Sequence, residues 1–216
     1  MHQDEDLGLW CELGRPEQLA RPALFLDRDG VIVTDTGYLG HAADLRMIEG
    51  VAAAIARCNA LRIPVVVVTN QSGIARGRYD WSGFCAVQAT LTAELTAAGA
   101  HLDGVLACAY HAEGLGPLRV DEHPWRKPNP GMILAAANGM NLDLGRSWIV
   151  GDKTSDLAAG AAAGLAGGTL VASSDQEGQE ALALAGTRFV VQMAANPAQA
   201  LMGLIAGGRF AGEVRS

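Results

Sequence analysis

Two aspartates separated by one residue stand where a short apolar segment ends. The segment Leu24–Leu26 is followed by Asp27, Arg28, Asp29 and Gly30. Side chains two residues apart on a β-strand point to the same side, so a strand here predicts both carboxylates at one point of the sheet edge. Carboxylates that close repel each other unless a divalent cation, a phosphoryl substrate or a shared proton compensates. The alternative is an ordinary turn, because Asp and Gly are both frequent in turns.

Three further polar clusters follow apolar segments. They are Thr-Asn-Gln-Ser-Gly at 69–73, Arg-Lys-Pro at 126–128 and Gly-Asp-Lys at 151–153. The second of these lies at the end of a loop that leaves its strand. Ligands of open α/β sheets bind beyond the carboxyl ends of the strands, so we expect the clusters to meet in one crevice. This regularity favours a functional site over a turn.

β-Rich apolar segments alternate with Ala-rich amphipathic segments along the chain. We expect strands at 23–27, 64–69, 104–110, 147–152, 169–172 and 188–191, separated by helices near 49–62, 80–98, 130–140, 154–164, 176–185 and 197–206. The valines at 65–68 are typical of a central parallel strand covered by helices. The alternation predicts an α/β fold, a Rossmann-like, doubly wound, mainly parallel sheet with helices on both faces. Only a short flap fits between Gly30 and the first of these helices, so no large cap domain is expected.

Composition and charge limit the class of function. The 216 residues are 50% hydrophobic and carry a net charge of −7, which fits a globular protein and disfavours a nucleic-acid partner, because backbone binding needs clustered Lys and Arg. There is no apolar run of membrane-spanning length, and no signal-peptide pattern at the acidic start. Four scattered cysteines without a CxxC pair suggest reduced thiols and a cytoplasmic location. We expect an N-terminal arm over 1–20, a single domain over 21–210 and, by default, a monomer.

The clusters contain the parts that hydrolysis of a phosphate monoester requires. This reaction is extremely slow without a catalyst, so positioning and charge stabilisation must lower its barrier. One carboxylate can attack phosphorus and form an aspartyl-phosphate, and a hard cation such as Mg²⁺ lets the two anions approach. A second acid must protonate the leaving alkoxide and then activate water. The chain offers a set of residues for these tasks: Asp27, Asp29, Thr69, Lys127 and Asp152.

The same segments resemble those of a known family. They are Phe-Leu-Asp-Arg-Asp-Gly at 25–30, Asp-Thr-Gly-Tyr at 35–38, Val-Thr-Asn-Gln-Ser-Gly-Ile-Ala-Arg-Gly at 68–77, Arg-Lys-Pro-Asn-Pro-Gly at 126–131 and Val-Gly-Asp-Lys at 150–153. The chain is similar to the Asp-nucleophile phosphatases of the haloacid dehalogenase superfamily. More narrowly, it resembles the D-glycero-D-manno-heptose 1,7-bisphosphate phosphatases and their relatives, the histidinol-phosphate phosphatases. The resemblance covers roughly residues 22–205, and the string at 68–77 is highly specific.

The resemblance implies a Mg²⁺-dependent phosphatase and assigns roles to the matching residues. Asp27 would be the nucleophile, Asp29 the general acid and base, and Thr69 and Lys127 would stabilise the phosphoryl group. Mg²⁺ would be held by Asp27, the main-chain carbonyl of Asp29, and Asp152. The rest of the substrate, a small phosphorylated sugar or alcohol, would contact Asp35, Thr36, Gly37, Tyr38, Asn70, Gln71, Ser72, Arg126 and Lys153.

Asp156 has two interpretations. It lies one helical turn beyond Asp152, on the same face, where it could orient Lys153 or a metal-bound water. Alternatively, it is an acidic residue in the first turn of a helix, which the helix dipole favours.

The resemblance leaves the substrate open among related phosphate esters. Its narrowest form implies hydrolysis of the C7 phosphate of D-glycero-D-manno-heptose 1,7-bisphosphate. Histidinol phosphate or another small sugar or alcohol phosphate is the alternative within the same chemistry. A dehalogenase needs no acid for its leaving group, so Asp29 argues against one. A catalytically silent phosphate-binding module would typically lack the nucleophile or the metal-binding acid, and Asp27 and Asp152 are both present.

The sequence departs from the family before the Arg-Lys-Pro motif. Heptose bisphosphate phosphatases commonly hold a structural zinc there, on a Cys-x-His and a Cys-x-Cys pattern, but this chain has Tyr110 and Trp125 at two of the ligand positions. Tyr is a poor zinc ligand and Trp is none, so we do not expect zinc. The alternative is a rearranged site from Cys108, His111 and His123, with an acidic residue at 121 or 122. Without zinc, Tyr110 and Trp125 are expected to pack against each other.

Overall fold

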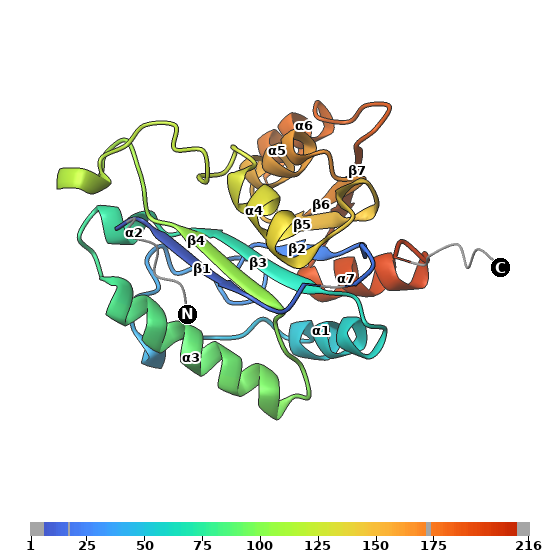
Figure 1. Ribbon diagram of the computed structural model, residues 1–216, viewed down its shortest axis with the longest axis horizontal. Coiled ribbons are helices and arrows are strands. Elements are labelled where there is room, and N and C mark those ends of the chain that lie inside the picture. The colour runs from blue at the N-terminus through green and yellow to red at the C-terminus, as the bar shows by residue number, and fades with distance from the viewer. Residues whose placement is uncertain (1–6, 17, 172–173, 211–216) are drawn as a thin grey trace.

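The valine-rich segment lies inside a sheet, as its sequence predicts. In the computed structural model, which describes residues 7–16, 18–171 and 174–210, the strands are ordered β1-β4-β3-β2-β5-β6-β7 (Figure 1). All neighbours are parallel except β1, which runs antiparallel to β4. The strands are β1 (Leu9–Leu13), β2 (Leu24–Leu26), β3 (Val65–Asn70), β4 (Gly104–Cys108), β5 (Trp148–Gly151), β6 (Gly167–Val171) and β7 (Val190–Ala194).

Helices cover both faces of the sheet (Figure 1). One face carries α1 (Val51–Ala60), α3 (Trp81–Ala97) and α7 (Pro197–Ala206), and the other carries α4 (Gly131–Met140), α5 (Thr154–Ala163) and α6 (Asp175–Leu182). Each face has its own hydrophobic cluster because strand side chains alternate: Leu24 and Leu26 join one cluster and Phe25 the other. The prediction of a doubly wound α/β fold is therefore confirmed.

The order of the strands creates a crevice at the carboxyl edge of the sheet. From β2 the chain adds β3 and β4 on one side, and then β5, β6 and β7 on the other. Ligands bind in such sheets at the point where the strand order reverses, here between β2 and β5. Asp27 directly follows β2, and Asp152 directly follows β5. Between Val31 and Gly50 the chain forms only one short 3₁₀ helix, Ala42–Asp44, so the crevice has no large cap, as predicted.

The six predicted helices are present, but several boundaries differ. β2 and β4 end at Leu26 and Cys108, earlier than predicted, although the next amides, of Asp27 and Ala109, still donate to the carbonyls of Val150 and Gly8. The short helix α2 (Ser72–Ala75) was not predicted. The predicted end of the β6 segment, Ala172, lies outside the described residues. Within the described part of the chain, no helix has both the length and the hydropathy needed to cross a membrane.

The predicted N-terminal arm over 1–20 is wrong for Leu9–Leu13. These residues form β1, with Leu9 opposite Cys108 and Leu13 opposite Gly104 in β4. The strand is also fixed by aromatic contacts, since the ring of Trp10 lies 6.0 Å from that of Trp81 and 5.6 Å from that of Phe84. The segment lacks a clear polar–apolar alternation, so its strand structure depends on partners far away in the sequence. Residues 1–6 and 17 of the arm lie outside the described residues.

Replacing Trp10 should show that β1 stabilises the domain. Trp10→Ala removes the contacts with Trp81 and Phe84, and we expect it to lower the free energy of unfolding by about 2 kcal/mol. Urea denaturation followed by circular dichroism measures this difference. Glu12 is exposed on the same strand, so Glu12→Ala is the matched control and should change the value by less than about 0.5 kcal/mol. Equally small effects of both substitutions would contradict a stabilising role for β1.

Candidate active site

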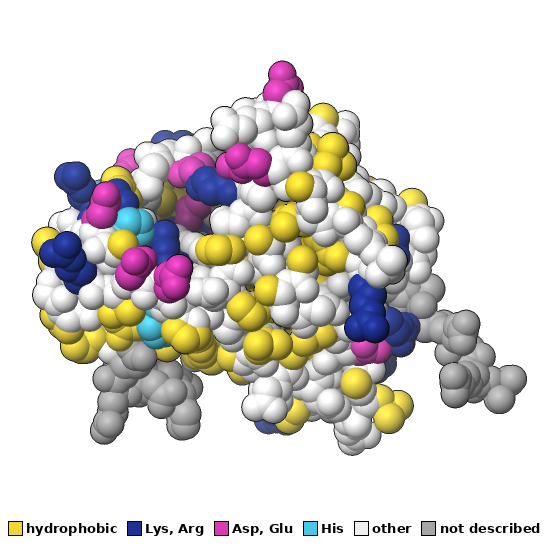
Figure 2. All heavy atoms as spheres, turned by 90° about the horizontal axis from the view of Figure 1, so that it is seen from above, with side chains coloured by type: hydrophobic (Ala, Val, Ile, Leu, Met, Phe, Trp, Pro, Cys, Tyr) yellow, Lys and Arg dark blue, Asp and Glu magenta, His cyan; other side chains and the backbone are white. Residues whose placement is uncertain are grey.

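The carboxyl ends of β2, β3 and β5 surround a cavity of about 380 Å³. On the space-filling surface, acidic and basic side chains gather around a hollow (Figure 2). The predicted site residues that line the cavity are Asp27, Asp29, Asp35, Gly37, Tyr38, Asn70, Gln71, Ser72, Arg126, Lys127 and Lys153. Residues that the sequence did not assign also line the cavity: Leu39, Gly73, Tyr79, Pro128 and Ser155. Asp156, for which the sequence left two interpretations, lines it as well. The structure thus brings the four polar clusters together.

Three predicted residues do not line the cavity. Thr36 is exposed in the segment after β2. Thr69 is only 1% exposed, and its Oγ1 accepts a hydrogen bond from Gln71 Nε2 at 2.8 Å. That bond uses the oxygen as an acceptor, so the Thr69 hydroxyl hydrogen can be donated elsewhere. Asp152 is partly buried beside Asp27 and is described with the acidic group below.

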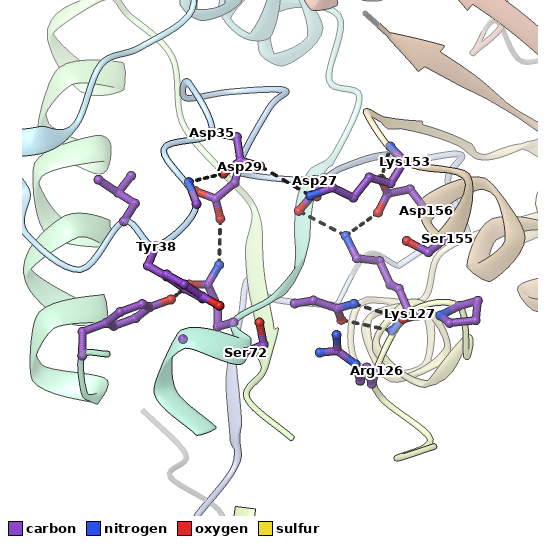
Figure 3. Close-up of a pocket in the computed structure, with 17 residues that line it drawn as sticks. Asp27, Asp29, Asp35, Tyr38, Ser72, Arg126, Lys127, Lys153, Ser155 and Asp156 are labelled. Carbon is purple, nitrogen blue, oxygen red and sulfur yellow. Dashed lines mark hydrogen bonds and ion pairs between the residues drawn. The ribbon is translucent and has the colours of Figure 1, made fainter. Parts of the chain in front are cut away.

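Lys127 is a buried cation between two carboxylates (Figure 3). Its Nζ lies 3.1 Å from Asp27 Oδ1 and 2.6 Å from Asp156 Oδ1, and it donates to the carbonyl of Val68 at 2.7 Å. Burial alone would lower the pKa of Lys127, but Asp156 and Asp27 outweigh burial and raise it. Lys127 therefore keeps its positive charge next to Asp27.

The main chain of Lys127 is fixed to the central sheet. Asn70, the last residue of β3, donates from Nδ2 to the Lys127 carbonyl at 3.0 Å and accepts from the Lys127 amide at 3.1 Å. A planar amide that makes both bonds to one residue restrains its position and its orientation. Lys127 is therefore held at both its main chain and its Nζ, although it comes from a long loop.

Asp156 is an acidic residue in the first turn of α5, and its side chain pairs with Lys127, a partner that neither interpretation named. Its Oδ2 accepts from the main-chain amide of Lys153 at 3.0 Å, as an acid in the first turn of α5 can do. Its Oδ1 makes the ion pair with Lys127. The carboxylate is 1% exposed, so this pair is shielded from solvent. Asp156 therefore caps α5 and orients the buried lysine at the same time.

Asp27, Asp152 and Asp156 form an acidic group that fits a metal ion. Their ligand atoms lie within 4.8 Å of one another, and no other three His, Cys, Asp or Glu residues do so in the described chain. Burial, together with the charges of Asp27 and Asp156, raises the pKa of Asp152 to about 7. Asp152 Oδ1 is buried without a hydrogen-bond partner among the described residues. Crowded carboxylates with an unsatisfied oxygen fit a hard cation such as Mg²⁺.

The side chain of Asp29 turns away from the acidic group. Its Oδ2 accepts from Gln71 Nε2 at 2.9 Å (Figure 3). The same oxygen accepts from Arg28 Nη2, also at 2.9 Å. Arg28 is fully buried, and Gln71 is 2% exposed. These partners hold the Asp29 carboxylate at the wall of the cavity, away from Asp27 and Asp152. A role of Asp29 in metal binding through its main-chain carbonyl stays a prediction.

Arg28 and Tyr79 are supporting residues that the sequence did not assign. Tyr79 donates its hydroxyl to Gln71 Oε1 at 2.5 Å, and Arg28 Nη2 donates to the same oxygen at 3.0 Å. Burial raises the pKa of Tyr79 to about 12, so it remains a neutral donor. A signal for Arg28 was present, because a buried Arg between two aspartates needs an anionic partner. Tyr79 had no comparable signal.

A second positive region lies on another side of the cavity. Arg126 lines it, and Arg76 lies close behind, with Nη2 at 2.8 Å from Glu113 and at 3.0 Å from His111 Nε2. Burial, reinforced by the charge of Arg76, lowers the pKa of Arg126. Arg remains protonated in proteins in spite of such shifts. Arg126 is thus a second fixed cation for an anionic ligand.

The loop before Arg126 contains a ring stack that the sequence did not suggest. Tyr110 stacks on His123, with ring centroids 4.3 Å apart and an angle of 21° between the planes. His123 Nδ1 lies 3.9 Å from Cys108 Sγ and accepts from the Trp125 amide at 3.1 Å. Cys108, His111 and His123 form no three-ligand group among the described residues, so the rearranged zinc site is not assembled. The absence of zinc stays a prediction.

Comparison with known sequences adds independent information. Residues 124–195 match the family model described as HAD-hydrolase-like. The chain is 51% identical over 172 residues to a D-glycero-beta-D-manno-heptose-1,7-bisphosphate 7-phosphatase of Mesorhizobium japonicum, with 79% of each chain covered. It is 43% identical over 154 residues to a D-glycero-alpha-D-manno-heptose-1,7-bisphosphate 7-phosphatase of Burkholderia mallei, covering 71% of this chain and 81% of the relative.

Solved structures agree with the sequence comparison. A HAD-like phosphatase from Mesorhizobium loti superposes with a TM-score of 0.87 at 43% identity, covering 100% of both chains. The D,D-heptose 1,7-bisphosphate phosphatase of B. bronchiseptica, complexed with magnesium and phosphate, gives a TM-score of 0.72 at 31% identity, covering 86% of this chain and 99% of that one. Likeness of this extent in both sequence and fold means that the chain belongs to the haloacid dehalogenase-like phosphatases, in the group of the heptose bisphosphate phosphatases.

Proposed function

We propose that this protein hydrolyses the C7 phosphate of D-glycero-D-manno-heptose 1,7-bisphosphate with Mg²⁺, through an aspartyl-phosphate on Asp27. The observation that carries the proposal is the position of Asp27, with Lys127 Nζ 3.1 Å from its carboxylate at the reversal point of the sheet. Relatives named as 7-phosphatases support the substrate. A relative complexed with magnesium and phosphate supports the cofactor.

The metal would be held by Asp27, the main-chain carbonyl of Asp29, and Asp152. When bound, Mg²⁺ neutralises charge between the carboxylate and the phosphate ester, two anions that otherwise repel each other. The unpartnered Asp152 Oδ1 supports this assignment, because a cation would satisfy it. Asp156 keeps its ion pair with Lys127 and acts on the reaction through that lysine.

In the first step, the Asp27 carboxylate attacks phosphorus and the bond between phosphorus and the C7 oxygen breaks. Asp29 gives its proton to the leaving alkoxide. The carboxylate is oriented for attack because Asp27 Oδ1 accepts from the Arg28 amide at 2.7 Å and lies 3.1 Å from Lys127 Nζ. Lys127 and the Thr69 hydroxyl stabilise the negative charge of the phosphoryl oxygens.

In the second step, water attacks the aspartyl-phosphate. Asp29, now a carboxylate, takes a proton from this water, and the bond between phosphorus and the Asp27 oxygen breaks. Inorganic phosphate leaves, and Asp27 and protonated Asp29 are regenerated. The contact with buried Arg28 Nη2, at 2.9 Å, holds the Asp29 side chain in place.

The rest of the cavity would bind the sugar and its other phosphate. Tyr38, Asn70 and Ser72 offer hydrogen-bonding groups to sugar hydroxyls. Asp35 Oδ2 lies 3.4 Å from Lys153 Nζ and would orient that lysine toward the substrate. Arg126 would take the phosphate at the far end. Gly37 and Gln71 belong to the same wall, whereas contact by the exposed Thr36, a cytoplasmic location and a monomeric state stay predictions.

Asp27→Asn should abolish phosphate release, because an amide is a very poor nucleophile. We expect kcat to fall by at least about 10³-fold with the heptose bisphosphate and with p-nitrophenyl phosphate. A colorimetric assay of inorganic phosphate measures the loss. Asp44→Asn changes an exposed acid in the same way and should retain full activity. Substantial turnover by Asp27→Asn would remove Asp27 as the nucleophile.

Asp29→Asn should affect two substrates differently, because a sugar alkoxide needs a proton to leave and a nitrophenolate does not. With the sugar phosphate, kcat should fall by about 10²–10⁴-fold, because the alkoxide leaves without a proton. With p-nitrophenyl phosphate, whose phenolate leaves readily, the first step should persist, and rapid quenching should show a burst of p-nitrophenol before slow steady-state turnover. Unchanged steady-state rates with both substrates would assign the acid to another residue.

Removal of Mg²⁺ should be visible both in activity and in stability. EDTA should stop turnover, and added Mg²⁺ should restore it. In a thermal-shift assay, saturating Mg²⁺ should raise the Tm by about 5 °C, because it binds only the folded carboxylate group. Asp152→Asn should lose most of this shift, while Asp44→Asn should keep it. Activity that persists after EDTA dialysis, or an equal shift in both variants, would contradict the assigned metal site.

A further inference from the structure

The loop between β4 and α4 delivers two adjacent cations to the cavity. It spans residues 109–130 and contains Arg126 and Lys127 near its end. Loops of this length have many conformations available, so each cation needs its own anchor. The structure gives the two residues different anchors, and this difference can be tested.

Lys127 is held mainly from the sheet and from α5. Asn70 fixes its main chain, while Asp27, Asp156 and the Val68 carbonyl bind its Nζ. None of these partners belongs to the loop. Substitutions in the first part of the loop should therefore leave the position of Lys127 unchanged.

Arg126 is held by the loop itself. Its Nη1 donates to the Tyr110 carbonyl at 3.2 Å, and its main-chain amide donates to the His123 carbonyl at 2.9 Å. In the described part of the chain no carboxylate pairs with Arg126, and the charge of nearby Arg76 repels it. The Arg126 guanidinium is therefore held by Tyr110, and the Arg126 main chain is held by His123.

Tyr110 and His123 are the two rings that stack on each other, at 4.3 Å between centroids. Tyr110 lies at the start of the loop and His123 near its end, so their contact closes the loop on itself. The Tyr110 ring is also packed against Gly8, the residue before β1, since a Cβ on Gly8 would lie 2.5 Å from its carbons. On the other side, His123 Nδ1 accepts from the Trp125 amide, next to Arg126.

We propose that the stacked pair Tyr110 and His123 positions Arg126 for the phosphate at the far end of the substrate. The inference rests on the proposed function and deepens it, because it assigns the recognition of the second phosphate to a pair of rings that touches no substrate atom. Stacking brings the Tyr110 and His123 carbonyls to where Arg126 binds both. Tyr110 and His123 are positioning residues, and Arg126 is the binding residue.

The test compares a substrate that has the second phosphate with one that lacks it. Tyr110→Leu removes the ring, and Tyr110→Phe is the matched control that keeps it. For each variant, for Arg126→Ala and for the double variant Tyr110→Leu with Arg126→Ala, kcat and KM are measured with the heptose bisphosphate and with p-nitrophenyl phosphate. Where Tyr110→Leu fails to fold by circular dichroism, His123→Leu removes the same stack from the other side.

Tyr110→Leu should raise KM for the bisphosphate by about tenfold, the loss expected when a charged hydrogen bond is misplaced. Its KM and kcat with p-nitrophenyl phosphate should stay within about twofold of wild type, because Lys127 keeps its separate anchors. Tyr110→Phe should match the wild type. Adding Tyr110→Leu to Arg126→Ala should raise KM for the bisphosphate no further, since the stack acts through Arg126.

Parallel losses with both substrates, or additive effects in the double variant, would overturn the inference and leave the stack as ordinary packing. If Arg126→Ala raises KM for the bisphosphate and Tyr110→Leu does not, the inference alone fails. If Arg126→Ala leaves that KM unchanged, the proposed contact between Arg126 and the second phosphate fails too. If the wild type does not hydrolyse the bisphosphate, the proposed function itself fails.

Discussion

The charge balance around Lys127 is the constraint on which the rest of the site depends. Three carboxylates, those of Asp27, Asp152 and Asp156, converge where the strand order reverses, and one buried ammonium group lies among them. This lysine and the more exposed Lys153, whose Nζ lies 3.9 Å from Asp152 Oδ2, do not balance the three negative charges. Burial, together with the charges of Asp27 and Asp156, raises the pKa of Asp152. A divalent cation would remove the excess of negative charge. This imbalance of charge thus favours the binding of a metal ion and, with it, a phosphate ester.

The fold meets this constraint by distributing the site over rigid and less rigid parts. Asp27 and Asp152 directly follow the parallel strands β2 and β5, and Thr69 and Asn70 end β3, so their positions are set by the hydrogen-bonded sheet. The cations come from a loop. Lys127 becomes as fixed as the strand residues because Asn70 and two carboxylates bind it, whereas Arg126 depends on the ring stack within its own loop. Lys127 is therefore held by residues outside its loop, whereas Arg126 is held by residues within it.

Much of this arrangement could be predicted because its determinants are local. The run Val65–Val68 is apolar on both faces, and a strand buried on both faces must carry helices on both sides. Polar clusters at the ends of such strands must then meet at one edge, which predicted that Asp27, Lys127 and Asp152 would lie together. Their roles came from the family resemblance and stay predictions. The errors concern contacts with distant partners. β1 forms because Trp10 meets Trp81 and Phe84, and the stack of Tyr110 on His123 was not suggested by the sequence.

The sequence by itself determined the residue types, the order of the elements and the acids that end the strands, because alternation and helical periodicity act between near neighbours. Only the tertiary structure decided which charges pair. Asp156 is one helical turn from Asp152, a spacing that left its role open, and it became the partner of Lys127 because α5 and the loop meet at the crevice. Asp29 lies two residues from Asp27, yet its carboxylate pairs with buried Arg28 and Gln71. In a crowded acidic site, each carboxylate takes the partner that the packing of the fold places beside it, and sequence spacing does not specify that partner.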